Sequence, residues 1–138
     1  MDYTLEVIEL PVNDVDRSLR FYTEQLGFNL DVDYQPNPHF RVVQLTPPGS
    51  ACSLHLESAA IVAPHTHYLV VTDLALAQQQ LHGRGVELHN VRHKSPLDTW
   101  AGGWEPGIDP EHHDYASLAQ LTDPDGHVWV IQERGYTP

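Results

Sequence analysis

The motif QLTPPG at residues 44–49 returns as QLTDPDG at residues 120–126, and in each place it joins two strand-like segments through a turn. A second echo precedes it in each half. Residues 12–14 read VND and residues 71–73 read VTD, and in both cases the Asp comes directly before a helical pattern. Because the echoes keep their order at a near-constant offset, the sequence predicts one structural unit written twice.

Hydrophobic periodicity predicts the order β-α-β-β-β in each half. In the first half we expect a helix that starts at Val15 and reaches Leu26, and strands over residues 5–12, 28–34, 40–46 and 51–56. In the second half we expect a helix that starts at Leu74, and strands over residues 66–71, 86–91, 115–121 and 128–132. The first module is expected over residues 3–57 and the second over 65–133, within a single domain spanning 1–138.

Composition limits the class of protein. Of the 138 residues, 41% are hydrophobic, which is a globular composition. The 19 acidic residues outnumber the 7 basic ones, so the net charge of −12 repels phosphate backbones and argues against nucleic-acid binding. No stretch resembles a secretory signal or a membrane helix, and the one cysteine rules out a disulfide within the chain. We therefore expect a cytoplasmic protein without membrane contact.

Three motifs resemble the vicinal oxygen chelate superfamily, which includes glyoxalase I, extradiol dioxygenases and bleomycin-resistance proteins. They are LPVNDVDRS at residues 10–18, DPDGH at residues 123–127, and FRVVQLTPPGS at residues 40–50, which is similar to short bacterial members, many of unassigned function. The resemblance covers nearly the whole chain. It implies an α+β fold, with two tandem βαβββ modules that form curved mixed sheets around a cleft, and it implies a homodimer.

In metal-dependent members of this superfamily, four strand positions hold the metal. The resemblance places these positions at Val7, Thr66, Val130 and either Ser53 or His55. Valine has no donor atom, and hydroxyl groups are poor ligands for a divalent transition metal. We therefore expect no metal and no other cofactor in this cleft.

Strand alternation places other polar side chains on the cleft face. Glu9 and His55 are the predicted catalytic residues, as a general acid/base pair. Alternatively, they form a structural hydrogen-bonded pair, or together hold a metal. The predicted ligand-binding residues on the strands are Tyr68, Gln132, Ser53 and Thr66.

A long loop is expected from residue 93 to residue 114, and loops of this length are often lids. It contains Trp100 and Trp104 on either side of Gly102 and Gly103. Tryptophan offers a flat face for an aromatic or sugar-like ligand, so both are predicted to bind ligand. The alternative is that both fill a space within the domain or a dimer interface.

The chain contains ten histidines. His65 and His67 share the strand face directed at the helix, where we expect surface residues and not a metal site. His89 and His93 are expected to be exposed. Trp129 has the parity of the helix-facing side and is expected in the core.

Three functions remain open on these residues. The first is a metal-independent protein that binds a small organic ligand, either to sequester it or to catalyse proton transfer on it. The second is a metal-dependent lyase, isomerase or dioxygenase with rearranged ligands. The third is a structural dimer with a vestigial cleft.

Overall fold

The computed structural model describes residues 1–99 and 101–138. The chain divides into two compact units, Met1–His65 and Thr66–Pro138. Within the described residues, the first unit holds a mixed sheet of four strands and the second a mixed sheet of five, each with a helix that follows its first strand. The predicted α+β class with a repeated βαβββ order is confirmed, while the single domain and the cleft stay predictions.

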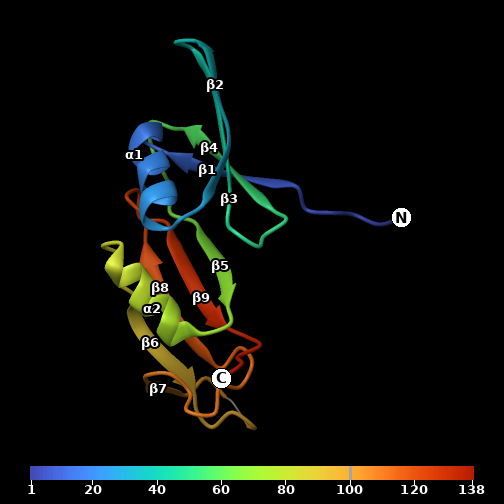
Figure 1. Ribbon diagram of the computed structural model, residues 1–138, viewed down its shortest axis with the longest axis vertical. Helices are drawn as coiled ribbons and strands as arrows, with labels where there is room; N and C mark the ends of the chain where they lie inside the picture. The colour runs from blue at the N-terminus through green and yellow to red at the C-terminus, as the bar shows by residue number, and fades with distance from the viewer. Residues whose placement is uncertain (100) are drawn as a thin grey trace. The chain divides into compact units, whose positions relative to one another are not determined.

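The first unit has strand order β1-β4-β3-β2, with β1 parallel to β4 and the other neighbours antiparallel. Figure 1 shows the β2–β3 hairpin extending beyond the other strands of this sheet. The elements of the first unit are β1 Val7–Val12, α1 Val15–Arg20, a π-helical segment Phe21–Gln25, β2 Asn29–Asn37, β3 Phe40–Thr46 and β4 Ser53–Ser58.

Local chemistry starts and ends the first helix. The side chain of Asp14 accepts a hydrogen bond from the backbone N–H of Arg17, as an N-cap should. The helical run closes at Gly27, whose φ of 75° is the left-handed conformation that glycine adopts without strain. The face of the sheet toward α1 carries the core, in which Leu10 and Val12 are fully buried.

The prediction of a half-buried strand over residues 28–34 is wrong in two respects. Strand β2 runs from Asn29 to Asn37, and every residue in it is exposed. The reason lies in the pairing of the hairpin. Among the described residues, β3 pairs with β4 only at Gln44–His55 and Leu45–Leu54, so the rest of the hairpin leaves the sheet and β2 remains its outer edge.

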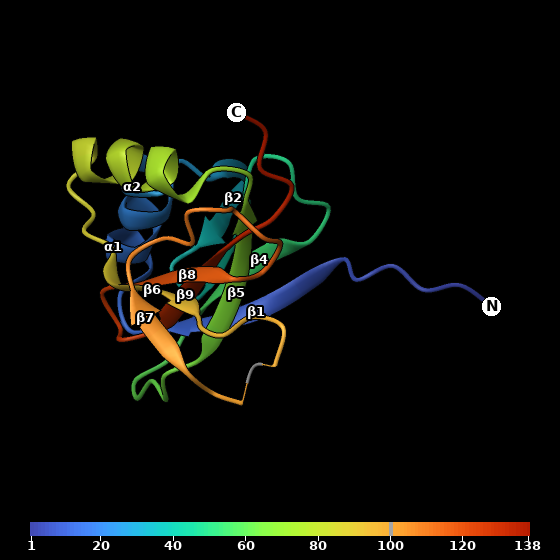
Figure 2. The same cartoon turned by 90° about the horizontal axis from the view of Figure 1, so that it is seen from below.

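The second unit has strand order β5-β9-β8-β6-β7, with β5 parallel to β9. Figure 2 shows α2 lying along one side of this sheet. Its elements are β5 Thr66–Val71, α2 Leu74–Gly83, β6 His89–Lys94, β7 Trp104–Pro106, β8 Ser117–Thr122 and β9 Val128–Glu133. In the part of the chain that the structure describes, no helix is long and apolar enough to span a bilayer.

Strand β6 is displaced from its predicted range of 86–91 toward the C-terminus. The backbone N–H of Val86 donates to Leu81 O at the end of α2, so it closes the helix instead of joining a strand ladder. Pairing with β8 begins only at His89. The strand therefore reaches Lys94, and the predicted 93–113 loop contains a further strand, β7, that pairs with it.

The face of the second sheet toward α2 holds a buried carboxylate. Glu133 ends β9 with 0% of its surface exposed, and its Oε2 accepts the backbone N–H of Leu74 at 2.8 Å, at the first residue of α2. A carboxylate is favoured at a helix N-terminus by the unpaired N–H groups there. Trp129 lies on the same face and is buried, as predicted.

Candidate functional site

The face of the first sheet opposite α1 presents the predicted pair. Parallel pairing sets Glu9 beside His55 and Val7 beside Ser53, all on one face. Nδ1 of His55 lies 3.7 Å from Oε1 of Glu9, which is within reach of an ion pair but longer than a hydrogen bond. The Glu9 side chain is 63% exposed and that of His55 28%.

A second carboxylate lies on the same face, next along β4. The neighbouring Glu9 carboxyl raises the pKa of Glu57 above its usual value, through a hydrogen bond and like-charge repulsion. Nε2 of His55 is buried without a hydrogen-bond partner among the described residues. The face therefore combines two competing carboxyl groups with an imidazole that has one unused nitrogen.

Ser53, predicted to bind ligand, is mostly buried and already engaged. Its Oγ donates at 2.7 Å to Oγ1 of Thr46, whose own proton is donated to a carboxylate oxygen of Asp31. This chain of polar contacts joins three strands on one side of the sheet. The hydroxyl of Ser53 therefore has a structural role at the base of this face.

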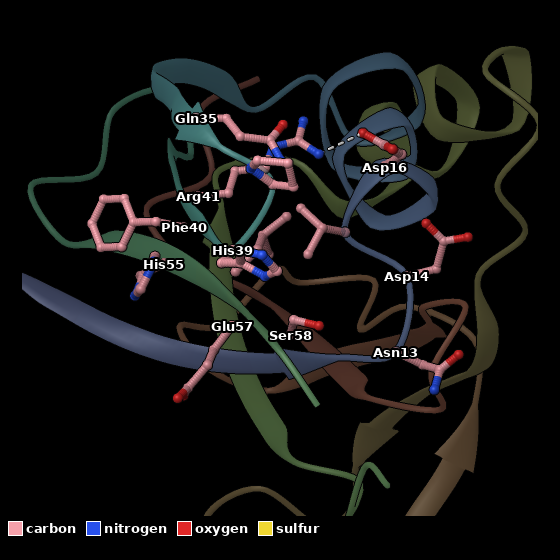
Figure 3. Close-up of a pocket in the computed structure, with 13 residues that line it drawn as sticks. Asn13, Asp14, Asp16, Gln35, His39, Phe40, Arg41, His55, Glu57 and Ser58 are labelled. Carbon is pink, nitrogen blue, oxygen red and sulfur yellow. Dashed lines mark hydrogen bonds and ion pairs between the residues drawn. The ribbon is translucent and has the colours of Figure 1, made fainter. Parts of the chain in front are cut away.

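A pocket of about 590 Å³ opens where the hairpin departs from β4. Its walls come from residues 13–16 before and in α1, residues 38–41 at the start of β3, and residues 55–58 of β4. Figure 3 shows His55 and Glu57 on one side of it and Asp14 on the other, with Arg41 reaching toward α1. The pocket is thus built within the first unit and shares His55 with the predicted catalytic pair.

Arg41 closes one wall of this pocket by joining it to the helix. Its guanidinium donates to Asp16 at 2.7 Å and to both carboxylate oxygens of Asp33 at 3.0 Å. These contacts hold the pKa of Asp33 below its usual value and raise that of Arg41. The cation is fully compensated, so its role here is to tie the hairpin to α1.

The face of the second sheet opposite α2 carries the remaining predicted residues. Thr66 and Tyr68 alternate with half-buried His67, and Tyr68 is 63% exposed. Gln132 lies beside Val70 and follows the same alternation. The second unit therefore brings the predicted side chains Thr66, Tyr68 and Gln132 onto one face.

At the outer end of this face, β7 places Trp104 directly across from Lys94. Trp104 is 38% exposed, and Cζ of Arg92 lies 4.7 Å from the centre of its ring. Arg92 and Lys94 were missed by the sequence reasoning, because the predicted strand stopped at Val91. Extending the period-two alternation by three residues would have found them. Trp100, also predicted to bind ligand, lies outside the described residues.

Histidine–carboxylate contacts hold residues 109–113 of the predicted loop. Asp109 accepts hydrogen bonds from the backbone N–H groups of Glu111 and His113 and contacts Nδ1 of His113 at 2.8 Å. Burial raises the pKa of Asp109, but these donors outweigh it and keep that pKa below its usual value. Nearby, Nδ1 of His112 lies 2.8 Å from Oε1 of Glu133.

Two further histidines make contacts within the second unit. His93 was expected to be exposed, but its side chain is only 14% exposed and its Nδ1 lies 2.8 Å from Gly107 O. The prediction failed because β7 pairs with this end of β6. The ring of His67 packs against Trp129 on the helix-facing side, with ring centres 5.0 Å apart and planes inclined by 41°.

The residues at the metal positions of the superfamily do not fit a metal. Val7 lies beside Ser53 in the first unit, and Val130 beside Tyr68 in the second, so neither place supplies a set of strong donors. Among residues 1–99 and 101–138, no group of three or more His, Cys, Asp or Glu side chains is arranged to hold an ion.

Comparison with known proteins identifies the superfamily. The model of the Glyoxalase/Bleomycin resistance protein/Dioxygenase superfamily matches residues 4–131, and the chain belongs to that superfamily. The resemblance inferred from the three motifs is thereby confirmed at this level. No curated protein matches the chain.

Solved structures share the fold along nearly the whole length. An antibiotic binding protein from Streptomyces sp. CB03234 is 24% identical, with 96% of each chain covered and a TM-score of 0.66. A glyoxalase/bleomycin resistance protein from the same strain is 25% identical, with 94% of this chain and 100% of that one covered and a TM-score of 0.65. A superfamily member from Sphaerobacter thermophilus is 22% identical, with 96% of this chain and 98% of that one covered and a TM-score of 0.69.

Proposed function

We propose that the protein binds a small organic compound on the faces of its sheets opposite the helices, without a metal ion. The observation that carries this proposal is that large apolar side chains on these faces stay exposed next to polar groups. Exposed apolar patches with a few polar groups are typical of ligand-binding surfaces. The apolar side chains are Val7, Val32, Tyr34 and Phe40 in the first unit and Tyr68, Val70 and Trp104 in the second.

Sequestration is the mode of action we favour. The similar Streptomyces protein is an antibiotic binding protein, and binding alone needs no catalytic group. Proton transfer is the other mode. In it Glu9 would take a proton from the ligand and His55 would return one, and their 3.7 Å separation allows both to reach the same molecule.

Thermal-shift screening with aromatic antibiotics tests the proposal. We expect a compound that raises the melting temperature of the protein, and we expect Tyr68→Ala to remove that shift. Tyr3→Ala is the matched control, because Tyr3 is exposed in the N-terminal segment, outside both sheets. The absence of any stabilising compound, or equal loss in the Tyr3→Ala variant, would contradict the proposal. Turnover of a bound compound that survives Glu9→Gln would remove the proton-transfer mode.

The two rival functions have direct tests. A stoichiometric transition metal in protein purified without a histidine tag would favour a metal-dependent enzyme. A dimer that buries Trp104 and binds no compound would favour a structural role. The homodimer and the cytoplasmic location stay predictions, and light scattering measures the first of them.

A further inference from the structure

We infer that the compound bound by this protein is an aromatic anion, and that Arg92 recognises its negative group. This inference rests on the proposed function, because it names the ligand chemistry of the same face. It begins with charge. The chain has only 7 basic residues against 19 acidic ones, yet two of the seven, Arg92 and Lys94, lie together on the side of β6 opposite α2, both partly exposed.

The register of the sheet fixes where these cations lie. Arg92 and Lys94 are separated by one residue, so they share a face of β6. Arg92 is paired with Leu118, Leu118 with Gln132, and Gln132 with Val70. The cations are therefore on the same face as the residues proposed to bind ligand.

The guanidinium of Arg92 uses only part of its bonding capacity. Its Cζ lies over the Trp104 ring, 4.7 Å from the ring centre, and Nη1 donates to Asn90 O at 3.0 Å. A guanidinium has five N–H donors, so these contacts leave most of its donors available to a ligand. No carboxylate of the described residues forms an ion pair with Arg92, in contrast to Arg41, which two aspartates hold.

An uncompensated planar cation fits one kind of partner best. A carboxylate or another planar anion accepts two parallel hydrogen bonds from a guanidinium edge, and such bonds are about twice as strong as neutral ones. Because the net charge of −12 repels anions at long range, selectivity for an anion has to come from contacts of this kind.

Trp104 supplies the aromatic part of the recognition. Its ring is 38% exposed beside Arg92, so the aromatic part of a ligand can contact the ring while its negative group accepts hydrogen bonds from the guanidinium. The backbone on either side of the ring is hydrogen-bonded. Ser95 N donates to Gly103 O at 3.2 Å and Gly107 N to Val91 O at 2.9 Å, on either side of β7.

Two matched probes, 2-naphthoate and 2-naphthamide, separate charge from shape. We expect the ¹⁵N-labelled protein to bind the carboxylate roughly tenfold more tightly than the neutral amide, the gain typical of one charged hydrogen-bonded contact. The carboxylate should shift the indole N–H signal of Trp104. Arg92→Gln should remove the preference for the carboxylate and leave binding of the amide unchanged. Arg84→Gln, which removes the same charge at the end of α2, should change neither affinity.

The outcomes distinguish this inference from the proposed function. If both probes bind equally, or if Arg84→Gln matches Arg92→Gln, the inference is refuted while small-molecule binding stands. If neither the probes nor the antibiotics bind, both fail. The inference is supported if the wild type binds the carboxylate about tenfold more tightly than the amide and the Arg92→Gln variant binds both equally.

Discussion

Replacing Glu133 by Gln tests whether the buried carboxylate is what joins α2, β9 and the 107–115 segment. Its two oxygens each receive one contact at 2.8 Å, from the backbone N–H of Leu74 and from Nδ1 of His112. Glutamine keeps the shape but offers one oxygen and one NH₂ group. The oxygen can still accept from Leu74, the NH₂ group then faces Nδ1 of His112, and the negative charge that both contacts use is removed.

The size of the effect follows from these contacts. A hydrogen bond to a charged group contributes about 1.5–3 kcal/mol. The helix N-terminus adds up to about 2 kcal/mol in a partly buried setting. We therefore expect Glu133→Gln to lower the free energy of unfolding by roughly 3–4 kcal/mol, near the range for breaking a buried charged pair. For a chain of this size, that is a fall of about 10 °C in melting temperature.

Urea denaturation followed by circular dichroism measures this loss. Glu111→Gln is the control, because Glu111 is an exposed carboxylate that touches His113 at only 3.6 Å. It should cost less than about 0.5 kcal/mol. His112→Asn removes the imidazole that contacts Glu133 and so tests the same contact from the other side. Asparagine is chosen because it tolerates the left-handed backbone at this position, where φ is 52°. A loss below about 1 kcal/mol in Glu133→Gln would refute the reasoning.

Three further results are expected. Because the pKa of Asp109 is lowered in the folded chain, its contribution to stability is present above the ordinary aspartate pKa and is lost as pH falls through the lowered value, so Asp109→Asn should flatten the acid limb of a stability–pH curve measured by urea denaturation. If the wild type and this variant have parallel acid limbs, the attribution is wrong. Gly103→Ala should loosen β7, since a Cβ there would stand 2.3 Å from Ser95 O, and faster amide exchange at residues 104–106 would report it. Arg41→Gln should cost no more than about 1 kcal/mol, because the ion pair with Asp16 is exposed, but should increase amide exchange in β2; unchanged exchange would show that Arg41 does not hold the hairpin.

The sequence predicted most reliably what depends on local chemistry and period. Asp14 and Asp73 cap their helices as expected, because an N-cap needs only a short polar side chain and the next three residues. Alternation placed Glu9 and His55 on the same face, where they are neighbours, and it predicted that Trp129 is buried. Both follow because the side-chain period of a strand is fixed at two.

What the sequence missed depends on contacts between distant segments. β7 exists because residues 104–106 find a partner in β6, and a three-residue strand has no periodic signal of its own. Glu133 was left out of the predicted strand. Its hydrogen bond with the backbone N–H of Leu74, 59 positions away, has no signal in the neighbouring sequence. The exposure of β2 likewise follows from where β3 and β4 separate.

That separation makes the β2–β3 hairpin an appendage with its own local stability. Its outer part is held by pairing between its own two strands and by Arg41, so its amides should open without unfolding the core. The turn at Pro38 and His39 is exposed and lies between strand ends, where added residues cost little loop entropy. It is therefore the place in the first unit to insert a peptide tag or attach a fluorophore, which would report on the nearby pocket.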